Sequence, residues 1–99
     1  MKSDLIQKHR VALQYLKDQF LKKCEEITIA AEQRMSHTSE IDTLTRRQIW
    51  EEQQNALKEC LNSLTKNVHK LNQDFFKNLE KKDNELILQQ LTHMDQIFN

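Results

Sequence analysis

An apolar residue recurs every three or four positions in residues 13–35, LQYLKDQFLKKCEEITIAAEQRM. The same spacing returns in residues 57–79. Such spacing places side chains on one face of an α-helix, and a period of eleven residues in three turns keeps that face nearly straight. We therefore predict an all-α fold made of long amphipathic helix. The apolar positions are Leu13, Leu16, Phe20, Cys24, Ile27, Ala31, Met35, Leu57, Cys60, Leu64, Val68, Leu71, Phe75 and Leu79.

The composition is typical of long solvated helices and argues against an enzyme. The chain contains no glycine and no proline, and 30% of its residues are charged. Without glycine, tight turns and phosphate-binding loops are disfavoured, and without proline nothing forces a helix to end. The four histidines have no carboxylate or cysteine at a spacing that completes a metal site. We expect neither catalysis, nor a metal, nor a cofactor.

The two apolar blocks are offset by 44 residues, which is four repeats of eleven residues, so the helical phase is kept across residues 36–56. The in-phase positions there are mostly polar, and residues 36–39, SHTS, are the poorest helix formers in the chain. Ser39 could cap a new helix. Two architectures remain: a single rod about 150 Å long, or two helices joined near residues 36–39. Retained phase and missing glycine favour the rod, with an irregularity possible at residues 36–42, and residues 1–99 form one coiled-coil segment.

The apolar face is too wide for a single pair of strands in a coiled coil. Apolar neighbours such as Leu21 and Phe76 lie directly beside the main line. A lone helix cannot bury this face, and each buried large side chain contributes about 1.5–3 kcal/mol. We therefore expect a homo- or hetero-tetramer, with this chain or a related coiled-coil chain as the partner, in the form of a four-helix bundle. The apolar blocks are symmetric about residue 46, which favours antiparallel packing of two chains without excluding a parallel one.

Charge and targeting features point to no nucleic acid or membrane. Fifteen basic residues balance fifteen acidic ones, and the basic clusters, such as Lys22–Lys23 and Arg46–Arg47, are short. Direct nucleic-acid binding by this segment is therefore disfavoured, although salt-sensitive duplex binding through these residues remains a weaker alternative. Apolar runs of about three residues are far below the roughly 20 that a membrane span needs. Cys24 and Cys60 are interpreted as reduced core residues, with a redox or interchain role as the alternative, so we expect an intracellular location.

Residues 49–54, IWEEQQ, open the second block. This stretch resembles the hydrophobic-Trp-x-x-Gln-Gln motif of the synaptonemal complex protein 3 family and its X-linked relatives. The resemblance extends over residues 49–82, and the coiled-coil segment of synaptonemal complex protein 2 is similar as well. We expect Ile49 and Trp50 to join the oligomer interface, and Trp50, which is near both the midpoint of the chain and the polar layer, to mark the centre of the bundle.

The resemblance also implies a biological setting: a filament-forming component of the meiotic chromosome axis, located on chromosomes in the nucleus. Members of that family form antiparallel helical bundles that join end to end. A second apolar line near the C-terminus would then dock onto the next bundle, or simply extend the core. The residues of this end-to-end candidate are Leu91, Met94, Ile97 and Phe98.

The leading hypothesis is thus a structural coiled-coil assembly module. The alternative is an adaptor, in which a folded-back helical hairpin presents a groove to a peptide partner. The adaptor requires a break in the helix at residues 36–39, and the rod does not.

Overall fold

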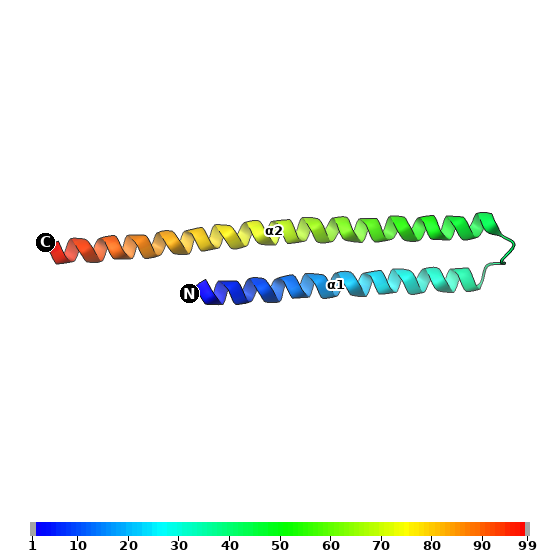
Figure 1. Cartoon of the computed structure of the whole chain (residues 1–99), viewed down its shortest axis with the longest axis horizontal. Helices are drawn as coiled ribbons and strands as arrows, with labels where there is room; N and C mark the ends of the chain where they lie inside the picture. Colours follow the sequence, from blue (N-terminus) through cyan, green and yellow to red (C-terminus); the bar gives the residue numbers. More distant parts are fainter. Residues whose placement is uncertain (1, 99) are drawn as a thin grey trace.

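Two long antiparallel helices joined by a short turn make up the chain (Figure 1). This computed structural model describes residues 2–98, with side chains as far as Met94. Helix α1 spans Lys2–Ser36 and helix α2 spans Thr43–Phe98. The longest dimension of the Cα trace is 88 Å, which is about the length of α2 alone at 1.5 Å per residue. The expectation of an all-α fold is confirmed.

The favoured rod of about 150 Å is wrong, because the helix is broken at residues 37–42 and the chain folds back. A break at this place is what the adaptor hypothesis requires. The turn needs no glycine, since no described residue has a positive φ. Polar side chains make the reversal possible by pairing the backbone groups that the helix ends leave free.

Hydroxyl groups satisfy the last turn of α1. The Ser36 hydroxyl donates to the Gln33 carbonyl at 2.7 Å, and the Thr38 hydroxyl donates to the Arg34 carbonyl at the same distance. Arg46, on the first turn of α2, donates to the Met35 carbonyl at 3.4 Å. Carbonyls that would otherwise continue the helix ladder therefore have partners, and α1 can end here.

Asp42 begins α2. Its carboxylate accepts the backbone N–H of Thr45 at 3.1 Å, which is the bond made by an N-cap residue. We expected Ser39 in this role, but its hydroxyl instead accepts the backbone N–H of Ile41 at 3.3 Å within the turn. The carboxylate at Asp42 also faces the positive end of the helix dipole, whereas the Ser39 hydroxyl carries no charge.

Replacement of Asp42 by alanine is expected to lower the melting temperature, because α2 loses its cap. Hydrogen bonds from the side chain and backbone of Thr45 lower the pKa of Asp42 from its ordinary 3.8. A lowered carboxyl pKa stabilises the fold above pH 3.8 and loses that effect as the pH falls below it. Thermal unfolding from pH 7 to pH 2 should show this loss in the wild type and not in Asp42→Asn, which keeps a cap without the charge. Equal acid sensitivity of the two proteins would contradict the assignment.

A stacked ring pair fixes the register of the two helices. The ring centroids of His9 and Phe75 are 4.0 Å apart with planes inclined by 18°. The same imidazole donates from Nε2 to the Asn72 side-chain carbonyl at 2.8 Å. Ion pairs join the helices near both ends, Lys2 with Asp83 and Arg34 with Glu52. In each of these contacts the two residue numbers sum to a value between 81 and 86. A nearly constant sum means that the contacts share one antiparallel register.

With this register the apolar positions of α1 and α2 pair level by level, each pair adding to 84. The spacing of four, four, three, read away from the turn, is the same in both helices. The pairs are Leu5–Leu79, His9–Phe75, Leu13–Leu71, Leu16–Val68, Phe20–Leu64, Cys24–Cys60, Ile27–Leu57, Ala31–Gln53 and Met35–Ile49. We call these nine pairs the inward layers. The pattern of spacings is thus symmetric about residue 42, and this symmetry pairs the two helices of one chain.

Candidate protein–protein interface

The apolar line that we predicted as an interface between chains lies in the inward layers. Every residue of that line is half-buried or buried in the hairpin, from Leu13 to Met35 and from Leu57 to Leu79. Two of the inward-layer residues are buried, Ile49 at 2% exposed and Ala31 at 8% exposed. The structure therefore places these side chains against the other helix of the same chain.

Burial inside the hairpin is nevertheless shallow. Ala31 and Ile49 are the buried hydrophobic residues among those described, and the other layer residues keep part of their surface in water. Two helices touch along a single line, so each side chain in that line has neighbours on one side only. The hairpin therefore leaves its two broad faces open.

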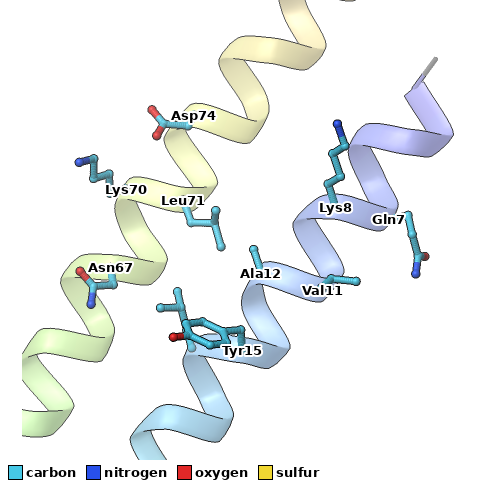
Figure 2. Close-up of a pocket in the computed structure, with 10 residues that line it drawn as sticks. Gln7, Lys8, Val11, Ala12, Tyr15, Asn67, Lys70, Leu71 and Asp74 are labelled. Carbon is cyan, nitrogen blue, oxygen red and sulfur yellow. The ribbon is translucent and has the colours of Figure 1, made fainter.

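The groove face is one of these two faces. Its first groove, of about 770 Å³, is lined by Ala12, Tyr15 and Leu71 among others, and Figure 2 shows Leu71 of α2 directed toward Ala12 of α1. A second groove of about 480 Å³ continues from it past Phe20 and Cys60. Leu16 and Asn67 line both grooves, so the two form one channel along the hairpin.

The rim of the groove face is mostly polar. The rim residues come one position before an inward-layer residue, and a step of one residue turns the side chain by about 100°. Because the helices are antiparallel, the same step leads to the same side of the hairpin from both. Tyr15 is the largest side chain on this rim, and the other members are small, polar or charged: Lys8, Ala12, Gln19, Lys23, Glu26, Ala56, Glu59, Ser63, Asn67, Lys70 and Asp74. Gln7 and Val11, which is 58% exposed, also line the first groove, two positions before an inward-layer residue.

The opposite side of the hairpin carries large exposed hydrophobic residues. Each comes one position after an inward-layer residue, so helical geometry turns it away from the groove face. All five are between 46% and 64% exposed. We call this surface the Trp50 face, made of Ile6, Leu21, Trp50, Leu61 and Phe76. Sequence reasoning noted some of these neighbours but did not separate them from the main line, because the side on which each lies depends on the antiparallel pairing.

The motif that resembles a meiotic axis protein, residues 49–54, is divided between the inward layers and the Trp50 face. Ile49 points inward and is buried, whereas Trp50 is 54% exposed on the Trp50 face. Trp50 lies near the start of α2 and therefore close to the turn of the hairpin.

The last part of α2 extends beyond α1. After Asp83, which is paired with Lys2, no residue of α1 lies alongside α2 (Figure 1). Leu91 and Met94, from the expected end-to-end patch, are 53% and 50% exposed there. The side chains of Ile97 and Phe98 lie outside the described residues.

Two further kinds of feature are absent from the described residues, a metal-binding cluster and a membrane-spanning helix. Residues 2–94 hold no group of three histidine, cysteine or acidic side chains placed to bind a metal ion. Neither α1 nor α2, as far as they are described, is apolar enough over a sufficient length to cross a membrane.

Comparison with known proteins gives no relative from which a role could be transferred. The chain matches no protein-family model, no curated protein and no solved structure.

Proposed function

We propose that this chain is a helical-hairpin assembly module that pairs with a second copy through the Trp50 face to form an antiparallel four-helix bundle. The observation that carries the proposal is the set of large, half-exposed hydrophobic residues on one side of a hairpin whose own interior is shallow. A four-helix bundle buries one such face of each hairpin and keeps the inward layers in its core.

The exposed area of the Trp50 face is sufficient for a dimer. Five half-exposed large side chains in each copy would remove roughly 1,000 Å² of apolar surface from water, taking roughly 100 Å² for each. Specific interfaces begin at about this size. Trp50 and Phe76 supply the aromatic anchors that such interfaces favour.

The charges beside the Trp50 face suit a second, antiparallel copy. On α1, Arg10 and Lys17 lie toward the open end of the hairpin, and Glu25 and Glu32 lie toward the turn. Each follows an inward-layer residue by one position, so all four flank the Trp50 face. A two-fold axis through Leu21 would bring Arg10 opposite Glu32 and Lys17 opposite Glu25 of the other copy. Opposite charges then meet at every one of these positions.

The aromatic residues fit the same arrangement. Leu21 of α1 and residue 63 of α2 lie at the same level of the hairpin, so the axis that passes through Leu21 also crosses α2 at residue 63. Trp50 and Phe76 are each thirteen residues from that point, on opposite sides of it. In an antiparallel dimer, Trp50 of one copy therefore meets Phe76 of the other. This self-complementarity is the reason for choosing a second copy over an unrelated partner.

The variant Leu61→Ser/Phe76→Ser should weaken the dimer at least tenfold while leaving helix content unchanged, because both side chains are outside the inward layers. The matched control is Val11→Ser/Tyr15→Ser, which removes two side chains of similar exposure, 58% and 62%, that line the groove face. Molar mass measured by light scattering over a range of concentrations gives the comparison. A wild type that is monomeric at every concentration, or a dimer lost only in the control, would overturn the proposal.

Charge reversal tests the antiparallel two-fold itself. Arg10→Glu/Lys17→Glu should weaken association, and adding Glu25→Lys/Glu32→Lys to the same chain should restore it. Rescue requires that the four residues meet their opposites in another copy, since residues eight or more apart on one helix are not neighbours. If the variant with all four charge reversals failed to associate, the two-fold axis through Leu21 would be wrong. The serine variants would still test the Trp50 face.

Membership in the meiotic axis family, with its nuclear location and filaments, stays a prediction that rests on residues 49–54. The assembly proposal does not depend on it.

A further inference from the structure

The two cysteines of the chain stand at the same level of the hairpin. Cys24 lies on α1 and Cys60 on α2, and both are half-buried free thiols. The stacked pair His9–Phe75 sets this level, because each cysteine is fifteen residues closer to the turn than the ring on its own helix. The cysteines therefore make up one inward layer.

The neighbouring layers show that both thiols point inward. Phe20 and Leu64 form the next layer on one side, Ile27 and Leu57 the next on the other, and all four are half-buried. Cys60 also lines the second groove together with Phe20, so this layer is open to small molecules from the groove face. Each helix thus contributes one thiol to this layer, and the layer can be reached from solvent through the second groove.

We propose that Cys24 and Cys60 are a reversible redox site that closes as a disulfide within one chain and locks the two helices together. Packed helices have axes about 8–10 Å apart, and each Cα lies about 2.3 Å from its axis. Facing Cα atoms are then about 3.4–5.4 Å apart, a range whose upper part overlaps the separation of about 4.4–6.8 Å that a disulfide requires.

The oxidant is a small-molecule disulfide such as oxidised glutathione. The thiolate of one cysteine attacks a sulfur of the oxidant, forming a mixed disulfide and releasing one small thiol. The second cysteine then attacks the protein sulfur of that bond and releases the second small thiol. Two protein thiols become one disulfide, one small disulfide becomes two thiols, and the two protons pass from the cysteines to the released thiols.

The disulfide would act as a lock because of where it lies. Residues 24 and 60 enclose the turn and the inner halves of both helices, so the crosslink restricts the unfolded chain over a long loop. The lock lies in the inward layers and leaves the Trp50 face unobstructed. It goes beyond the assembly function, and it holds whether or not the hairpin pairs with a second copy.

The experiment equilibrates the purified 99-residue chain with mixtures of reduced and oxidised glutathione and separates the products by mass and on a non-reducing gel. We expect a single species of monomer mass, 11.9 kDa less two hydrogens, with a melting temperature raised by more than about 10 °C. Cys24→Ala and Cys60→Ala should each abolish both changes.

A displaced cysteine supplies the matched control. Cys60→Ser/Asn62→Cys keeps two thiols and nearly the same loop, but places the second on the exposed outer side of α2. It should require at least tenfold more oxidant to close within one chain. The proposal would be overturned by any of three results: equal closure in the control, persistence of both thiols in the wild type, or covalent dimers in place of closed monomers.

Discussion

Leu64→Glu is expected to unfold most of the hairpin at room temperature. Leu64 is half-buried in the layer that it forms with Phe20, near the middle of the helix pair. The substitution removes apolar burial and places a carboxylate beside an aromatic ring, at a combined cost of about 3 kcal/mol or more. Small domains have little stability to lose, so a change of this size shifts most molecules toward the unfolded state. Circular dichroism during heating gives the helix content and the melting temperature.

The control for this variant is Asn62→Glu, which adds the same charge two residues away on the exposed outer side of α2. A surface charge at such a position changes stability by only about 0.5 kcal/mol. Equal melting temperatures for the two variants would show that Leu64 is not an inward residue, and the register derived from His9 and Phe75 would then be wrong as well.

The sequence predicts the helix content, but the retained helical phase does not predict that the chain folds back on itself. Spacing of three and four fixes which residues of a helix share a face, and the structure places those residues in the inward layers. Retained phase favoured one rod, yet phase says nothing about a hairpin, because each helix turns its own face toward the other independently. The informative signal was the reversed order of spacings about residue 42, together with the capping residues Ser36, Thr38 and Asp42.

The candidate interface was less accessible from the sequence, for a geometric reason. An apolar residue that follows an inward residue and one that precedes it look alike in a periodicity count. On α1, Leu21 lies on the opposite side of the inward line from Ala12 and Tyr15. Only antiparallel pairing brings Phe76 of α2 to the same side as Leu21. The predicted interface was therefore the whole apolar line, whereas the structure uses that line within one chain and leaves a second set of residues exposed.

The turn decides between a hairpin and a rod, and its removal should convert one into the other. Replacing His37, Thr38, Ser39, Ile41 and Asp42 by alanine removes the caps made by Thr38 and Asp42 and supplies strong helix formers. The helical phase is kept over four elevens, so a continuous helix would carry both apolar blocks on one face. Two such helices, running antiparallel, could form every inward layer twice, with residue 24 of one chain facing residue 60 of the other.

We expect this five-alanine variant to form a dimer about 150 Å long, against 88 Å for one wild-type hairpin. Small-angle X-ray scattering measures the length, and oxidation should now join Cys24 and Cys60 between chains, at twice the monomer mass. The control replaces five exposed outer residues of α2 by alanine, namely Asn55, Asn62, Lys66, Gln73 and Lys77. It gains similar helix propensity but keeps the turn, so it should stay short. A variant that also stays short would mean that layer pairing alone holds the hairpin closed, and that the caps only mark where it bends.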